Sequence, residues 1–256
     1  MLVAVPHEVV AATDAVSFDR VDIMLPVAPE SVALGDHDGL HGKDIVVALP
    51  APGKVGVLLN NGDGTFASMV QYSAGPECVS LAVDITLGDV TTPAPGDRLQ
   101  HDGKLDSYVA CTPYVVRLTG DGTGALTNPE PINLGVAQSL GSSTSDMLAL
   151  MRRPDPSQVP LLVFQRSSGT GPKLCISYNL DPGESLACGT ASVQGPLAVG
   201  DLNGTIPTVP PDEVVTSEGG ALMGIFGFAP PIPPSTPMTW GDSTRNVPGS
   251  PPGVES

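Results

Sequence analysis

The chain of 256 residues carries 27 acidic and 11 basic side chains, which give a formal net charge of −16. Because nucleic-acid binding relies on Lys and Arg that neutralise phosphates, this charge argues against a nucleic-acid partner. Hydrophobic residues make up 41% of the chain, which is too many for a disordered protein, and no apolar run is long enough to cross a membrane. The abundant glycine and proline residues predict many turns between short elements.

The first thirty residues contain short apolar segments separated by polar ones. We expect a strand at each of the segments 2–5, 8–12, 15–18 and 22–25, which together would form a short or truncated unit. The N-terminal residues lack the basic start and long apolar stretch of a signal peptide, which suggests a chain entered within a repeat.

Residues 31–77 show the clearest pattern. Three apolar runs are followed by an Asn-Gly and Asp-Gly turn and a fourth short strand; the four predicted strands are 32–34, 45–49, 55–59 and 68–72. Apolar runs bounded by Gly, Asn and Asp are typical of an antiparallel meander, because these turn residues supply the positive φ of tight hairpins.

The loop between the first two of these strands is rich in carboxylates. Asp36, Asp38 and Asp44 lie within nine residues, together with two glycines that let the backbone wrap. Closely spaced carboxylates suit a hard cation such as Ca²⁺, which takes six to eight oxygen ligands. The alternative is an ordinary solvated turn. A zinc site at His37 and His41 is disfavoured, because the surrounding residues are carboxylates rather than further His or Cys.

The same pattern returns along the chain at intervals of about fifty residues. A Gly-Asp pair recurs at 35–36, 88–89 and 200–201, and an acidic residue opens an apolar run at Asp44, Asp106, Asp146 and Asp212. Five units result, at about 1–30, 31–77, 78–135, 136–190 and 191–228, followed by a Pro/Ser/Gly-rich tail or linker at 229–256. Four short strands per unit predict an all-β radial array of antiparallel blades, a β-propeller.

The motif Gly-Asp-x-Asp/Asn-Gly-x-x-x-x-Asp, followed by an apolar strand and Leu-x-Asn-Gly-Asp-Gly-Thr-Phe, resembles the FG-GAP/VCBS repeat family. The likeness is strongest at VALGDHDGLHGKDIVVA and LLNNGDGTF in 31–77, weaker in 78–135 and 191–228, and degenerate in 136–190. It implies a calcium-loop β-propeller, as in bacterial secreted proteins and integrin α-chain heads, possessing the five visible units or forming part of a larger ring. Leu40 stands where the family usually has an Asp, which lowers the expected affinity of that loop.

The resemblance implies calcium ligands in three loops. The expected ligands are Asp36, Asp38 and Asp44; Asp89, Asp102 and Asp106; and Asp201, Asn203 and Asp212. In the second loop an insertion leaves the first place open between Asp89 and Asp97, while Asp102 and Asp106 match the fifth and ninth places. The degenerate unit 136–190 keeps only Asp146, which we interpret as a structural turn residue.

The four cysteines predict two disulfides. Cys175 and Cys188 flank a turn and would face each other across a hairpin. Cys78 is expected to open the first strand of the third unit and Cys111 to end its second strand, so that these two also meet. Two such pairs indicate an oxidising compartment, whereas the alternative is four separate buried thiols.

No catalytic motif is visible: the chain has no Gly-x-Ser-x-Gly elbow, no phosphate-binding loop and no His-Glu-x-x-His. Periodic carboxylates favour a structural device repeated in each unit over a single active site. We therefore expect a non-catalytic, secreted or cell-surface calcium-binding module that binds a protein or glycan ligand in adhesion. The alternatives are a propeller that acts on polysaccharide or assists such an enzyme, and a purely structural repeat of a larger surface protein.

Overall fold

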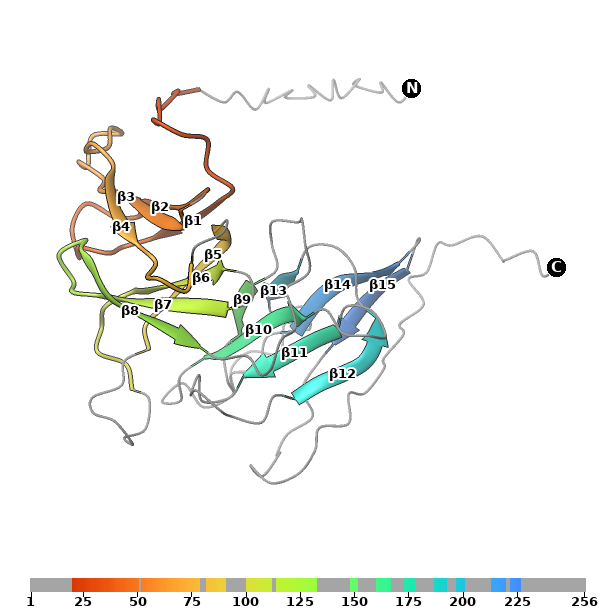
Figure 1. The fold of residues 1–256 in the computed structure, drawn as a ribbon. Coiled ribbons are helices and arrows are strands. Elements are labelled where there is room, and N and C mark those ends of the chain that lie inside the picture. The colour runs from red at the N-terminus through yellow and green to blue at the C-terminus, as the bar shows by residue number, and fades with distance from the viewer. Residues whose placement is uncertain are drawn as a thin grey trace, which may run out of the picture.

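The computed structural model describes residues 20–50, 52–78, 82–90, 100–111, 114–132, 148–151, 160–166, 173–177, 187–192, 197–200, 213–219 and 222–226. All regular structure within these residues is β-strand, and every strand pair is antiparallel, which confirms the all-β class. The strands form four separate sheets in chain order (Figure 1). No helix in the described part of the chain is long and apolar enough to span a membrane.

Each sheet is a meander of consecutive strands. Sheet I contains β1 (Ser31–Gly35), β2 (Asp44–Leu49), β3 (Lys54–Leu58) and β4 (Val70–Ser73), and sheet II contains β5 (Ala82–Gly88), β6 (Asp106–Cys111), β7 (Tyr114–Gly120) and β8 (Leu126–Ile132). Sheet III contains β9 (Leu148–Met151), β10 (Leu161–Arg166), β11 (Lys173–Ser177) and β12 (Ala187–Ser192), and sheet IV contains β13 (Ala198–Gly200), β14 (Glu213–Gly219) and β15 (Leu222–Phe226). Sheets I, II and IV lie within the expected units, whereas β12 runs two residues past the expected boundary at 190.

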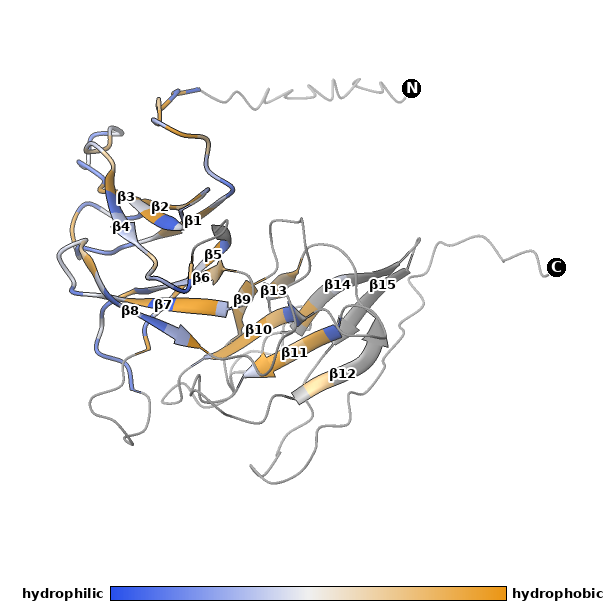
Figure 2. Cartoon of the chain, viewed as in Figure 1, coloured by the Kyte–Doolittle hydropathy of each residue, from blue (hydrophilic) through white to orange (hydrophobic). Residues whose placement is uncertain are grey.

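The sheets pack face to face, and each interface is an apolar cluster. Val46 and Val57 of sheet I meet Val109 and Val116 of sheet II. A second cluster lies between sheets II and III, and a third lies between sheets III and IV. Strands β7, β10 and β11 are coloured largely hydrophobic in Figure 2. They belong to sheets II and III, which are covered on both faces.

The first strands of successive sheets lie side by side: β1 beside β5, β5 beside β9, and β9 beside β13. The buried carboxylate of Asp84 joins three of these sheets. One oxygen accepts a hydrogen bond from Ser31 Oγ at 2.7 Å and the other accepts one from the Leu148 backbone N–H at 2.8 Å. A buried acceptor shared in this way fixes the order of sheets I, II and III.

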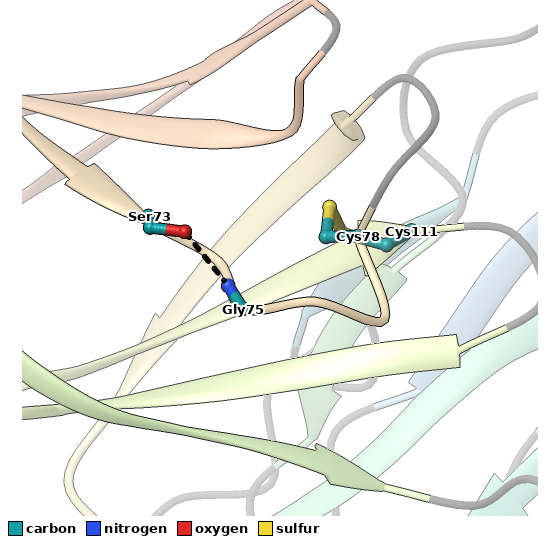
Figure 3. The surroundings of a disulfide bond; sticks show 4 residues. All are labelled: Ser73, Gly75, Cys78 and Cys111. Atoms are coloured by element: carbon teal, nitrogen blue, oxygen red, sulfur yellow. Dashed lines mark hydrogen bonds between the residues drawn. A yellow bond between two sulfur atoms is a disulfide. The ribbon is translucent and has the colours of Figure 1, made fainter.

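Both predicted disulfides are present. The buried disulfide joins Cys78 to Cys111 and ties the segment that leaves sheet I to the end of β6 (Figure 3). The hairpin disulfide joins Cys175 to Cys188, which are register partners on β11 and β12. One detail of the prediction is wrong: Cys78 lies in a turn region after β4, four residues before β5 begins at Ala82.

The strand expected at residues 22–25 is also wrong. Residues 20–30 contain no strand, and their apolar side chains have no partner strand, so that Val21 is 76% and Met24 91% exposed. Three other predictions fall outside the described residues. They are the remaining three strands of the first unit, the turn at Asp146 and the tail 229–256.

Candidate metal centre

The loop between β1 and β2 is shaped by its own carboxylates. Asp36 Oδ1 accepts a hydrogen bond from the Gly39 N–H at 2.7 Å, and Asp38 Oδ1 accepts one from the Leu40 N–H at 2.8 Å. The backbone turns through the left-handed region at Gly39, with φ of 72°, which glycine adopts without the steric cost of a Cβ. The sequence therefore folds this loop back on itself.

Asp44 links the acidic loop to the neighbouring turn through two hydrogen bonds, an arrangement that we call the clasp. Its side chain is fully buried at the start of β2. Oδ2 accepts a hydrogen bond from the His37 N–H at 2.7 Å, and Oδ1 accepts one from the Asn60 N–H at 2.8 Å. This one carboxylate thus fastens the loop to the turn that follows β3.

The three predicted ligands of this loop converge. Asp36, Asp38 and Asp44 each offer one carboxylate oxygen, and these atoms lie within 4.8 Å of one another. Oxygens that each lie about 2.4 Å from one calcium ion are at most about 4.8 Å apart, so the spacing of the three is compatible with a shared ion. None of the three takes part in an ion pair among the described residues. The loop therefore suits a hard cation, and backbone carbonyls or water would complete its coordination.

His37 does not neutralise this cluster. Its side chain is 2% exposed, and burial lowers the pKa of its imidazole although the three nearby carboxylates oppose that change. The ring is therefore neutral at pH 7. No histidine belongs to the converging group in the described part of the chain, so the structure adds no support for zinc.

The loop between β5 and β6 repeats this clasp. Asp106 is fully buried; its Oδ2 accepts a hydrogen bond from the Val90 N–H at 3.3 Å and its Oδ1 one from the Gly120 N–H at 2.9 Å. Asp89 accepts from the Gly103 N–H at 2.9 Å, as Asp36 does from Gly39. Asp89 therefore takes the first place of this loop, and Asp97 lies outside the described residues.

The second loop differs in its carboxylates. Among the described residues, Asp89, Asp102 and Asp106 do not converge as the first three do. Asp102 Oδ1 accepts a hydrogen bond from the Lys104 N–H at 3.1 Å, as Asp38 Oδ1 does from the Leu40 N–H. Burial raises the pKa of Asp106 to about 7, so this carboxyl is a poorer cation ligand at neutral pH.

A buried arginine that the sequence did not single out lies beside the second loop. Arg117 is 8% exposed, donates from Nη1 to the Val90 carbonyl oxygen at 3.3 Å and pairs with Glu130. It lies three residues before Gly120, as Val57 lies three residues before Asn60 in sheet I. Arg117 thus occupies in sheet II the position that Val57 has in sheet I. The sequence feature that could have pointed to Arg117 is a charged residue inside the apolar run 115–118.

The third predicted loop lies outside the described residues, including Asp201, Asn203 and Asp212. The register of sheet IV pairs Gly200 with Glu213. In sheets I and II the equivalent pairs are Gly35 with Asp44 and Gly88 with Asp106. Glu213 therefore holds the register position in sheet IV that Asp44 and Asp106 hold in sheets I and II.

The acidic loop and two hairpin turns share one edge of the sheets. The Gly124 N–H in the turn after β7 donates to the His37 carbonyl oxygen at 3.2 Å. In the turn after β3, a Cβ on Gly62 would lie 2.9 Å from His41 Cδ2, so this turn packs directly on the loop. No protein-family model matches the chain, and no curated protein or solved structure matches it either.

Proposed function

We propose that this chain is a non-catalytic, calcium-binding module of β-propeller type that acts in an extracellular or cell-surface protein and binds a protein or glycan ligand. The observation that carries the proposal is the convergence of Asp36, Asp38 and Asp44 within 4.8 Å. Calcium, when bound, supplies a double positive charge that accepts these oxygens as ligands.

The electrostatics of the loop favour a bound cation. Two carboxylates separated by about 4.8 Å repel by about 1 kcal/mol at the dielectric constant of water and by about 3.5 kcal/mol at an effective value of 20. Three such pairs are present in the cluster, and no cationic side chain is paired with any of them among the described residues. Asp36 and Asp38 keep their second oxygens free of the hydrogen bonds that shape the loop, and these oxygens would hold the ion together with Asp44.

The arrangement of the sheets supports a propeller. Consecutive meanders pack face to face, and their first strands follow one another side by side, as blades do around an axis. The family likeness of the sequence motifs predicts the same architecture. The two disulfides support an oxidising and therefore extracellular location, because disulfides persist there and are rare in the cytosol.

The loop edge is the proposed ligand-binding surface. Connections between first and second strands and between third and fourth strands emerge at this edge, where Asp36, Asp63 and Asp121 are exposed. Exposed carboxylates and backbone groups on rigid turns are suited to hydrogen-bonding sugar hydroxyls or the basic groups of a protein. A bound cation would hold these turns in place through the Asp44 clasp.

Calorimetric titration with CaCl₂ tests the metal centre. The double variant Asp36→Asn/Asp38→Asn should lose one bound calcium per chain, because two of the three converging carboxylates are removed. Asp63→Asn is the matched control, since Asp63 is an exposed carboxylate of the adjacent turn and lies outside the group. Equal calcium stoichiometry in the wild type and the double variant would refute the proposed centre.

Screening against immobilised glycans and cell-surface proteins, with calcium and with chelator, tests the ligand-binding part. Binding that needs calcium and is weakened by Asp36→Asn/Asp38→Asn supports it. Cleavage of a polysaccharide by the purified chain would contradict the non-catalytic assignment.

A further inference from the structure

A pair of apolar residues, two positions apart, marks the start of each of the later sheets. Each pair belongs to the apolar cluster shared with the preceding sheet. The pairs are Ile85 and Leu87 in sheet II, Leu148 and Leu150 in sheet III, and Leu197 and Val199 in sheet IV. Each of these sheets thus covers the sheet before it with residues of its first strand, joined in sheet IV by Leu197, which directly precedes β13.

A leucine of this pair rests on a glycine at two of the interfaces. A Cβ built on Gly35, at the end of β1, would lie 2.8 Å from Leu87 Cδ1 and 2.6 Å from Leu105 Cδ1, so Leu87 shares this contact with a leucine of the following loop. A Cβ built on Gly88, at the end of β5, would lie 2.2 Å from Leu150 Cδ1. Each contact is therefore a leucine seated where only a glycine leaves room. The third interface differs on both sides. Met151 ends β9 where β1 and β5 end in glycine, and the smaller Val199 takes the place of the leucine.

Sheet I carries the same pair on β1, and none of the described residues covers it. Val32 and Leu34 on β1 are 60% and 58% exposed. They precede Gly35 as Ile85 and Leu87 precede Gly88. Farther across this face Met69 packs on Gly56, so the uncovered surface is concentrated on the first strand.

Sheet IV carries the complementary half of the contact. Gly200 ends β13 and pairs with the first residue of β14, as Gly35 and Gly88 pair with the first residues of β2 and β6. No described residue lies within 4 Å of a Cβ built on Gly200. Among the described residues, leucine side chains therefore pack on the terminal glycines of β1 and β5, and none packs on the terminal glycine of β13.

We propose that sheet I of one copy of this chain docks on sheet IV of a second copy, with Leu34 seated over Gly200 and Val32 beside it. No part of the chain that the structure describes covers Val32 and Leu34. A second copy supplies the unfilled glycine that fits. Two copies joined at both ends form a closed two-fold pair, because each copy offers both halves of the contact.

This interface depends on the stacking of the sheets and not on calcium. Loss of calcium binding would therefore leave it intact, and loss of association would leave the metal centre intact. The high negative charge of the chain opposes self-association, and salt screens that repulsion. The contact should accordingly be weaker at low ionic strength.

Sedimentation velocity of the full chain over a range of concentrations tests the proposal. The wild type should associate reversibly, and Val32→Ser/Leu34→Ser should raise the dissociation constant at least about tenfold, since about 1.4 kcal/mol of lost apolar contact has that effect. Val70→Ser should change it less than about twofold: Val70 is a similarly exposed apolar residue of the same sheet, on β4. Unchanged circular dichroism shows that the variants are folded.

Cysteine cross-linking identifies the partner surface. All four native cysteines are in disulfides, so an added thiol is the sole free one. Leu34→Cys and Gly200→Cys chains, purified separately and mixed under mild oxidation, should form a covalent heterodimer, whereas Val70→Cys mixed with Gly200→Cys should not. The proposal is overturned if the wild type is monomeric at every concentration. It is also overturned if Leu34→Cys/Gly200→Cys in one chain cross-links without gain of mass, since the contact then lies within a single copy.

Discussion

Replacing Asp44 by alanine separates the structural clasp from the cation site. The buried carboxylate accepts two backbone hydrogen bonds, from the N–H groups of His37 and Asn60. A hydrogen bond to a charged acceptor contributes about 1.5 to 3 kcal/mol, and a buried donor left without a partner costs a similar amount. Asp44→Ala should therefore lower the free energy of unfolding by about 3 to 5 kcal/mol even when a chelator removes all calcium.

Asp36→Ala is the matched comparison within the same loop. Asp36 is exposed and accepts one hydrogen bond from its own loop, so its loss in chelator should cost less than about 1 kcal/mol. Asp106→Ala should be destabilising in the same way but less than Asp44→Ala, because one of its two hydrogen bonds is longer, at 3.3 Å, and burial raises the pKa of Asp106 to about 7, so that its carboxyl is only partly charged at neutral pH.

Urea denaturation in chelator measures these differences, and hydrogen exchange followed by mass spectrometry locates them. In Asp44→Ala, the amides of the acidic loop and of the turn after β3 should lose protection first. If Asp44→Ala and Asp36→Ala are destabilised equally in chelator, the buried carboxylate is not a clasp and the reasoning fails.

Three further predictions concern cross-links, a titration and an inter-sheet contact. Removing the buried disulfide, whose cysteines are 33 residues apart, should cost about 4 kcal/mol, against about 3 kcal/mol for the hairpin disulfide with a separation of 13; equal urea midpoints for the two double Cys→Ser variants would contradict the loop-length argument. Hydrogen bonds from Thr123 lower the pKa of Asp121, so this carboxylate stabilises the fold above its usual pKa and the contribution is lost as pH falls through the lowered folded value. Thr123→Val should raise the pKa of Asp121 in an NMR titration of its carboxyl carbon, and an unchanged midpoint would refute the assignment. Ser31→Ala removes the hydrogen bond to Asp84 and should cost about 2 kcal/mol in denaturant unfolding, whereas Ser73→Ala, with an exposed bond to a backbone N–H, should cost less than about 0.5 kcal/mol; equal losses would show that the link between sheets I and II is not stabilising.

The strands of the clearest unit could be predicted because local patterns determine them. Apolar runs between glycine-rich turns became β2 and β3, and hairpin geometry correctly placed Cys175 opposite Cys188. The segment 22–25 has a similar local pattern and is not a strand. A strand needs a hydrogen-bonding partner, and a local apolar run does not reveal whether one is present.

The roles of the site residues could be predicted only in part. Asp36 and Asp44 are both aspartates of the same acidic loop, and the sequence does not distinguish them. In the structure Asp36 is exposed, whereas Asp44 is buried against the turn at Asn60, sixteen residues later. Arg117 takes the position of Val57, and only the strand register shows that it faces the second loop. Burial and register arise from tertiary packing, which spacing along the chain does not specify.

Thermal unfolding with calcium and with chelator, for the wild type and Asp36→Ala, tests the proposed metal centre most directly. A ligand at one hundred times its dissociation constant adds about 2.7 kcal/mol to the stability of the folded state, which corresponds to a rise in Tm of about 5 to 10 °C for a chain of this size. The wild type should show this rise, and Asp36→Ala should lose at least half of it while keeping nearly the wild-type Tm in chelator. A wild-type Tm that is the same with calcium and with chelator would contradict the cation site and leave the acidic loop as a turn held by Asp44 alone.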